Sequence, residues 1–572
     1  MTYADELGKI TRIPVTLVVI TLDYCGRTFG VDPCLATGSK CWNTFKTCKY
    51  KTAYLKQSKD YKITSADAPL PFKTGERPYL QRVKYLPTEI KDSFTVNARV
   101  TIECYDVPDT DVGIDPYVTT RSAFPNIPGT FWKKLITRNK NYKGRTVKIY
   151  EGFLGLAENE FEQKFVGTID NITLGEGEVK IEVVDLLKSL SNVEIPPKVD
   201  IKLVSDTAID AATITLTTLT GLYAAPAYIR IKDDIIYYTG TAGGNQITGC
   251  IWGQFGSTKE AHKAKDKVQP VRYIPPTDGF DIMKTLLTTD SGIDASYVDT
   301  AAFDYWKAWP ETDMNFSAII SEPTKADKLY FELVDLLDCK SWVAEDLKIT
   351  IKRNVPNEPG RGYKTITDAA NIIHDSASVD LNEKSRITRM LLYWDRIAIG
   401  KVDDVNAYNR LDIGLDSDAE GDNDYNDIVE KKVFCRWIRS GYETEETVNN
   451  FIKDLLARQV WRQRDAMPIL QCSLELKDSD IKTGQFTKVS TDELLQPDGN
   501  PIDKVIMQVI RREMQDRLVK VKLLQLTPRR LAYIAADDTP DYASASDAQK
   551  EYGFITDDEA LMPDGTEGYY TY

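Results

Sequence analysis

The sequence predicts a β-rich α+β fold divided into several domains. The chain has 572 residues, too many for one hydrophobic core, and its apolar content of 42% and charged content of 28% are ordinary for a globular protein. Strict alternation from Phe94 to Cys104 puts one face of apolar side chains on a strand. Helical periodicity over 447–464 predicts a long amphipathic helix. We therefore expect several sheets, each buried on one side, joined by a few helices.

The first third of the chain is mostly strand. The β-branched run Val15–Leu22 predicts a first strand, and residues 129–138 predict a short amphipathic helix. Three more strands are expected at 146–150, 165–174 and 179–184. Gly175–Gly177 supplies the hairpin turn between the last two. Residues 52–90 show no clear periodicity, and Cys104 is expected in the core because it lies on the apolar face of its strand.

Two proline pairs, Pro196–Pro197 and Pro275–Pro276, bracket the next segment. Such pairs stiffen junctions and stop strands. Short runs rich in Thr, Ile, Ala and Tyr lie between them, so we expect residues 197–275 to form an inserted all-β domain whose ends meet. The following region, 276–400, is expected to be mixed α/β, with a helix over 325–340 that ends at Cys339. Strands are expected there at 347–352 and 386–399.

The last third combines the long helix with another set of strands. These strands are expected at 469–476, 505–511 and 518–526, the last two forming a hairpin. We group residues 401–535, including the helix, as one domain. Residues 536–572 are acidic, rich in Gly, Pro and Tyr, and poor in aliphatic side chains. Such a segment cannot build its own core, so we expect an arm that docks on a neighbouring chain through its tyrosines.

Charge and hydropathy exclude some functions. The net charge is −14, which argues against a protein that grips nucleic-acid phosphates. No run of about 18 apolar residues occurs, so no membrane span is expected. The start of the sequence lacks the pattern of a secretory leader, and we expect synthesis in a reducing cytosol.

Few residues offer catalytic or calcium-binding chemistry. There are only two histidines, His262 and His374, and the only local Cys–His combination is Cys250 with His262, in a Lys-rich run typical of a surface. A cysteine peptidase is therefore disfavoured, whereas a glycosidase that uses two carboxylates is not. Asp416–Asp427 superficially matches a calcium loop, but its last position is Asp rather than Glu. A solvated acidic loop is the preferred interpretation, and whether it binds calcium stays open.

Four of the nine cysteines are concentrated near the start of the chain. Cys25, Cys34, Cys41 and Cys48 are separated by eight, six and six residues. They could form two disulfides, a zinc site, an iron–sulfur site or an ordinary buried cluster. Structural zinc usually recruits thiols two to four residues apart, and four spread thiolates suit a cuboidal iron–sulfur cluster. The aromatic residues nearby, Trp42, Phe45 and Tyr50, could shield the thiolates from water.

The same stretch carries a family resemblance. The first strand runs into DYC, CGRTFGVDPC and KCWNTFKTCKYKTAY. This run resembles the cysteine-rich loop of tail-tip hub proteins from long-tailed bacteriophages and gene transfer agents. The resemblance implies that Cys25, Cys34, Cys41 and Cys48 bind a [4Fe–4S] cluster, with zinc as the alternative. It also implies that FVGTID and VKIEVVDLLKSL belong to a tube-like β domain, and that GCIWGQFGSTKEAH belongs to a small inserted domain.

Mapped onto this sequence, the resemblance implies a complete domain plan. Residues 1–24 and 79–196 would form a first tube-like domain, 25–78 the cysteine-rich iron–sulfur loop, and 401–535 a second tube-like domain. The implied function is that of a structural virion protein rather than an enzyme. It would be a homotrimeric hub of the tail tip or baseplate, assembled in the host bacterial cytoplasm, whose two β domains alternate in a pseudo-sixfold ring. A tail-associated enzyme that degrades cell wall is the alternative.

The resemblance also implies partners. These are the distal tail protein, the tail tube, the C-terminus of the tape measure, and the central fibre or other baseplate proteins. DNA would pass through an acidic lumen without specific binding. The hub would close the tail tube and open it for DNA ejection.

Overall fold

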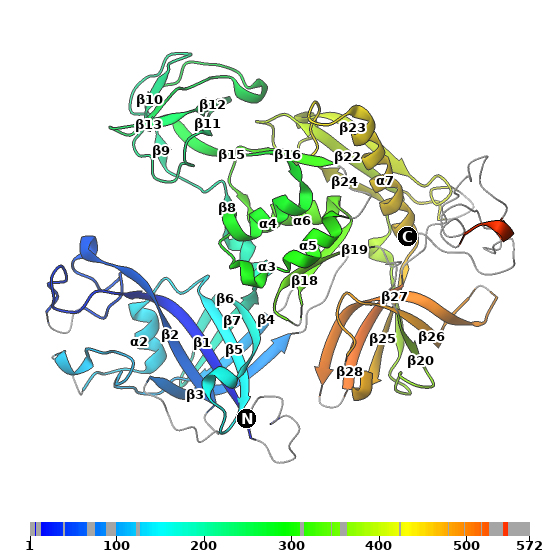
Figure 1. The fold of residues 1–572 in the computed structure, drawn as a ribbon, viewed down its shortest axis with the longest axis horizontal. Helices are drawn as coiled ribbons and strands as arrows, with labels where there is room; N and C mark the ends of the chain where they lie inside the picture. The colour runs from blue at the N-terminus through cyan, green and yellow to red at the C-terminus, as the bar shows by residue number, and fades with distance from the viewer. Residues whose placement is uncertain are drawn as a thin grey trace.

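The computed structural model describes residues 6, 13–37, 41–65, 75–86, 99–121, 126–308, 314–344, 346–354, 363–421, 425–478, 480–496, 498–515, 518–525 and 542–546. It confirms the expected β-rich α+β fold, with several separate sheets (Figure 1). Most of the predicted C-terminal arm, 536–572, lies outside the described residues. No helix within the described residues is both long and apolar enough to cross a membrane.

The first body is a closed seven-stranded barrel with the strand order β1-β2-β3-β4-β7-β6-β5. Its strands are β1 Pro14–Cys25, β2 Lys56–Ser65, β3 Glu76–Leu86, β4 Arg99–Tyr105, β5 Thr146–Phe153, β6 Glu162–Leu174 and β7 Glu178–Asp185. Neighbouring strands are antiparallel except β2 and β3, which are parallel. Helix α2 (Phe131–Arg138) packs Phe131, Trp132 and Leu135 into the barrel core, where Cys104 also lies as predicted. Closure leaves no free strand edge on the barrel.

Two barrel strands come from the region without clear periodicity. The range 25–78 is therefore too long for the cysteine-rich loop, because β2 lies inside it and pairs along β1. Only the second half of β2 is buried, through Tyr61 and Ile63, whereas its first half is mostly exposed and polar. A strand that leaves the core halfway along shows too few alternating apolar residues to be recognised. Part of the predicted strand over Phe94–Cys104, residues 94–98, lies outside the described residues.

The inserted region has its own core but no break at its second proline pair. Its strands are β9 Ile201–Lys202, β10 Thr213–Thr215, β11 Ala227–Ile231, β12 Asp234–Tyr238, β13 Gly240–Ala242, β14 Gln246–Thr248 and the long β15 Lys267–Asp278. The prediction that Pro275–Pro276 stops a strand is wrong, since β15 continues through this pair. Its first part pairs with β11 of the insertion, and its second part pairs with β16 (Asn315–Ile320). The pair sits in a register shift between Ile274 and Thr277, where a missing N–H is tolerated.

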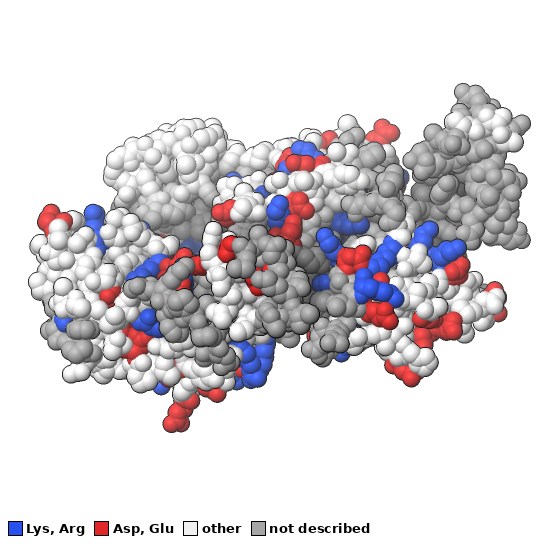
Figure 2. Space-filling model, turned by 60° about the horizontal axis from the view of Figure 1, so that its bottom comes forward, with Lys and Arg blue, Asp and Glu red and all other residues white. Residues whose placement is uncertain are grey.

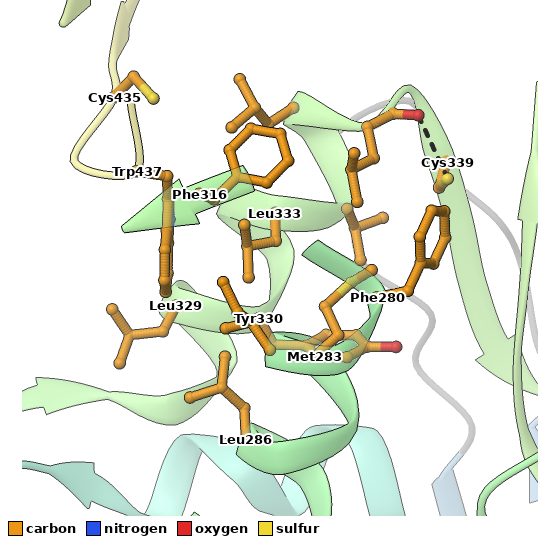
Figure 3. Packing of buried hydrophobic residues seen from close by; sticks show 14 of the residues in the cluster. Phe280, Met283, Leu286, Phe316, Leu329, Tyr330, Leu333, Cys339, Cys435 and Trp437 are labelled. Atoms are coloured by element: carbon orange, nitrogen blue, oxygen red, sulfur yellow. Dashed lines mark hydrogen bonds between the residues drawn. The ribbon is translucent and has the colours of Figure 1, made fainter. Parts of the chain in front are cut away.

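The largest core lies in the central body. It is built from α4 Gly279–Thr285, α5 Thr300–Lys307, α6 Ala326–Leu336, α7 Glu445–Gln463, the short α3 Leu186–Ser189, β16, the hairpin of β18 Cys339–Val343 with β19 Ile349–Arg353, and the sheet of β22 Arg389–Arg396, β23 Tyr408–Leu415 and β24 Glu430–Phe434. Figure 3 shows Phe280 and Met283 of α4 facing Leu333 of α6, with Trp437 alongside. The short pair β8 Glu194–Ile195 and β17 Thr324–Lys325 joins this body to the barrel side.

Two expectations about this body are wrong. Cys339 does not end the helix but begins β18, because Asp338 adopts a φ of +51° and turns the chain out of the helix. Helix α7 was grouped with the last sheet, yet its apolar stripe is buried in the central core with α4 and α6. Its periodicity predicts a buried face but does not identify the surface that covers it.

The last body is a six-stranded sheet with the order β20-β26-β27-β28-β25-β21. Its strands are β20 Lys364–Thr367, β21 Ser378–Asn382, β25 Met467–Glu475, β26 Phe486–Leu495, β27 Pro501–Gln515 and β28 Leu518–Gln525. The predicted hairpin is confirmed as β27–β28. Trp342 of β18 connects the central body to this sheet by packing with Met467, Phe486 and Ile510.

Candidate metal centre

The four cysteines of the predicted site lie on one loop at the end of the barrel. β1 ends at Cys25, which is paired in register with Lys56 at the start of β2. The chain therefore leaves the barrel after Cys25 and returns to it at Lys56, and these two points are neighbours. The Gly26 N–H donates to the carbonyl of Leu55 at 2.8 Å and closes the neck of this loop. All nine cysteines fall within the described residues, and each carries a free thiol.

The cysteines of the loop differ in environment. Cys25, Cys34 and Cys41 are buried, whereas Cys48 is only partly covered. Cys34 and Cys41 share a small apolar cluster with Phe29. Burial raises the pKa of the Cys41 thiol above its ordinary value, against the opposing effects of a backbone hydrogen bond and the Arg121 guanidinium. This thiol is therefore protonated at neutral pH in the metal-free chain.

The four side chains are of the type that binds such metals, but the structure does not bring them together as a ligand set. Four thiols on one loop are the ligands that zinc and iron–sulfur clusters take. Within the described residues, however, no three His, Cys, Asp or Glu side chains lie close enough together to hold a metal ion. The assignment of Cys25, Cys34, Cys41 and Cys48 as ligands stays a prediction.

A buried arginine from outside the loop anchors it to the barrel. Arg121 is 2% exposed; its Nε donates to the carbonyl of Cys41 and its Nη2 to the Oδ1 of Asn43, both at 2.7 Å. Its Nη1 pairs with the carboxylate of Asp115. One planar guanidinium thus binds the carbonyl of Cys41, the amide oxygen of Asn43 and the carboxylate of Asp115. These contacts hold the cysteine loop at a fixed position. We call this set of contacts the Arg121 clamp.

Two aromatic rings of the loop, those of Trp42 and Phe45, pack against cations, whereas Phe29 packs against Cys34 and Cys41. The indole of Trp42 lies 4.7 Å from the guanidinium of Arg121 and 3.8 Å from that of Arg138. The ring of Phe45 is 51% exposed, and the Lys51 ammonium lies 5.0 Å from its centre. Trp42 therefore strengthens the clamp through cation–π contacts. The sequence offered no signal for Arg121, which lies 80 residues from Cys41 in a polar segment.

The only local catalytic candidate is placed differently from the expectation. His262 was expected on a Lys-rich surface but is 1% exposed. Its ring stacks on Trp252 with centroids 5.4 Å apart, and its Nε2 lies 3.7 Å from the Oδ2 of Asp234. The thiol of Cys250 instead lies 3.8 Å from the carbonyl of Ile247. The neighbours of His262 in the core of the insertion are therefore Trp252 and Asp234.

This burial makes the inserted region sensitive to mild acid. Burial lowers the pKa of His262 below its ordinary value of about 6.5, with Asp234, Glu260 and Asp266 opposing the shift and Lys232 reinforcing it. Below about pH 6.5 the unfolded chain binds a proton that the folded chain resists, so the free energy of unfolding falls as the pH falls. We expect hydrogen exchange of β11 and β12, corrected for intrinsic rates, to show less protection at about pH 5.5 than at about pH 7.5.

The variant His262→Gln provides the comparison, because it retains a polar side chain that does not titrate. Asp234, whose pKa is raised by burial, contributes the opposite slope in both proteins. The acid-dependent loss should therefore be smaller in the variant. Equal pH dependence in both proteins would show that His262 does not control it.

The acidic run suggested as a calcium loop uses its carboxylates elsewhere. Asp416 accepts from the Ala419 N–H at 2.9 Å and pairs with Arg464 at 3.2 Å. Glu420 pairs with Arg389 at 2.7 Å. Residues 422–424 lie outside the described part of the chain. Asp416 and Glu420 therefore form ion pairs with arginines of the protein, at the end of α7 and on β22.

Comparisons with known proteins gave only distant similarity. No family model and no curated protein matches the sequence. Among solved structures, a tail protein from Neisseria meningitidis MC58 aligns with 78% of this chain and 96% of its own, at 10% identity and a TM-score of 0.35. The 43 kDa tail protein of prophage MuSo2 from Shewanella oneidensis aligns with 77% and 97%, at 10% identity and a TM-score of 0.34. A virion of a native gene transfer agent aligns with 57% of this chain and 76% of its own, at 10% identity and a TM-score of 0.29. TM-scores below 0.5 carry no conclusion about function.

Proposed function

We propose that this chain is a structural hub protein at the tail tip or baseplate of a long-tailed bacteriophage or gene transfer particle. The observation that carries the proposal is the cysteine loop, which leaves a closed barrel between β1 and β2 and is held there by the Arg121 clamp. That loop is the segment whose sequence resembles tail-tip hubs. A loop built around a buried arginine and emerging from an edge-free barrel suits a rigid structural part.

In this proposal three copies form a ring that closes the tail tube and carries the central fibre or baseplate. Each chain would contribute the barrel and the six-stranded sheet as alternating units of a pseudo-sixfold ring. Both bodies are mainly antiparallel and contain one parallel pair: β2 with β3 within the closed barrel, and β20 with β26 at one edge of the six-stranded sheet. The parallel pair in each body supports two related units, although α7, the helix that was expected on the six-stranded sheet, packs into the central core instead.

DNA would pass such a ring without being gripped. On the face shown in Figure 2, basic and acidic side chains lie next to one another instead of forming one basic field. With a net charge of −14, the chain offers little attraction for phosphates. The distal tail protein, the tail tube and the tape-measure C-terminus are the proposed contacts of the ring.

The alternative, an enzyme that degrades cell wall, is tested separately. We expect purified protein to release no soluble fragments from peptidoglycan and to give a native mass of three chains. Released fragments that disappear when a carboxylate is replaced would favour the enzyme. A stable monomer from disassembled particles would exclude the trimeric ring.

The loop is further proposed to bind a [4Fe–4S] cluster, or zinc, through Cys25, Cys34, Cys41 and Cys48. A metal would supply the cross-link that a loop with only a small apolar cluster cannot make for itself. Protein purified without oxygen should contain iron and sulfide, measured by elemental analysis and absorption spectroscopy. Replacing any one of the four cysteines with Ser should remove the metal and loosen residues 26–55.

The matched control is Cys104→Ser, since Cys104 is buried in the barrel core rather than in the loop. It should retain the metal. Stoichiometric zinc without sulfide would replace the cluster by a zinc site and keep the ligands. A metal-free protein after anaerobic purification would reject both.

A further inference from the structure

A large cleft separates the central body from the six-stranded sheet. Its volume is about 710 Å³. One wall is formed by α5 and the β18–β19 hairpin, and the other by the segment that leads into β26. Clefts of this size commonly hold small molecules. The cleft lies outside the cysteine loop.

The cleft is lined by aromatic side chains: Tyr305, Trp306, Trp342, Tyr363 and Phe486. Tyr305 stands edge-on to Trp306, with ring centres 4.9 Å apart, and is 48% exposed. Tyr and Trp combine a broad apolar face with a polar edge, so such a wall suits a ligand that has both kinds of surface.

The charged side chains of the cleft balance one another: Asp299, Asp480, Lys352 and Lys482. The carboxylates are also engaged with protein groups. Asp299 caps α5 and accepts from the Thr350 hydroxyl at 3.0 Å, and Asp480 pairs with Lys364. A ligand with net charge would therefore find no excess of opposite charge. Single-stranded nucleic acid, which also stacks on aromatic rings, needs such an excess of cations.

Uncharged polar groups complete the lining. Trp342 is 5% exposed, and its indole N–H finds no hydrogen-bond acceptor within the described part of the chain. This N–H is itself buried, so Trp342 is counted here only as an aromatic residue of the lining. Thr350 and Gln485 add a hydroxyl and an amide to the same cleft.

We propose that this cleft binds a neutral oligosaccharide. Sugar rings present C–H faces that stack on Tyr and Trp, and hydroxyls that match uncharged donors and acceptors. The site binds rather than hydrolyses its ligand, because glycoside hydrolysis needs a carboxyl group that donates a proton. The pair with Lys364 lowers the pKa of Asp480 and keeps it ionised, and Asp299 is held by α5 and Thr350.

The test uses the full chain and an immobilised panel of short uncharged oligosaccharides of glucose, galactose, mannose and N-acetylglucosamine. Sulfated and sialylated oligosaccharides and a short single-stranded DNA serve as charged probes. We expect binding to at least one neutral member, weakened roughly tenfold by Tyr305→Ala.

The matched control is Tyr105→Ala, which removes a 40% exposed tyrosine from the barrel strand β4. It should bind as tightly as the unmodified chain. The proposal is overturned if no neutral member binds, if only charged probes bind, or if Tyr305→Ala retains full affinity. Release of reducing sugar from a bound member would reject a binding-only site.

Discussion

Replacing Arg121 with Ala should release the cysteine loop from the barrel. The substitution removes both hydrogen bonds to the loop and leaves the carboxylate of Asp115, which is 9% exposed, without its cation. Breaking a buried ion pair by removing one partner costs about 3–5 kcal/mol. Trp42 also loses one of its two cation–π partners. We expect hydrogen exchange over residues 26–55 to rise to the level of an open loop, and the barrel to unfold at lower denaturant concentration.

Two variants separate the clamp from a general effect of lost charge. Arg121→Lys keeps the cation but not the planar fork, and should lie between the two proteins. Arg145→Ala removes a partly exposed ion pair with Asp23 on the same barrel, and exposed pairs contribute little. If the loop exchanges at the same rate in Arg121→Ala as in the unmodified chain, the loop is anchored by other contacts.

Replacing Gly484 with Ala should break the connection between the central body and the six-stranded sheet. Gly484 has a φ of +80°, and an added Cβ would lie 2.2 Å from the ring of Trp342. The left-handed backbone costs an Ala residue roughly 1–2 kcal/mol, and overpacking adds about 1–3 kcal/mol. The indole must leave its cluster with Phe486 and Ile510, so we expect lost protection in β18 and β26 and a lower free energy of unfolding.

Gly499→Ala is the matched control. Gly499 has a similar φ of +87°, but an added Cβ there meets nothing within 4 Å, so only the backbone cost applies. A double-mutant cycle of Gly484→Ala with Trp342→Ala should show strong non-additivity, because the clash is absent once the ring is removed. If both glycine substitutions lower the free energy of unfolding equally, the ring of Trp342 moves aside without loss of stability.

The sequence predicts the elements whose apolar residues alternate or recur at helical spacing. The predicted apolar stripe of α7 is buried, and the strands expected at 15–22, 165–174 and 179–184 are present as β1, β6 and β7. Strand β26 was missed because Thr487 and Thr491 occupy buried positions on it, so its buried face does not read as apolar. Patterning identifies a buried face, whereas the partner surface depends on contacts far apart in the sequence.

The candidate site shows the same division. Clustering of Cys25, Cys34, Cys41 and Cys48 in the sequence predicts one loop, and the structure has them on one loop. Spacing in the sequence does not show whether their thiols converge, and among the described residues no three His, Cys, Asp or Glu side chains lie close enough together to hold a metal ion. Arg121 could not be found from the sequence, because a lone arginine in a polar segment gives no sign of its burial.

Electron cryomicroscopy of intact particles tests the central claim most directly. A small tag inserted at the β13–β14 turn, where Gly243 and Gly244 face open space, would mark each copy without disturbing the insertion core. The proposed function predicts three tagged copies in a ring at the distal end of the tail, with the barrel and the six-stranded sheet alternating around the lumen. Six copies, a label spread along the tube, or the absence of this chain from the particles would contradict it.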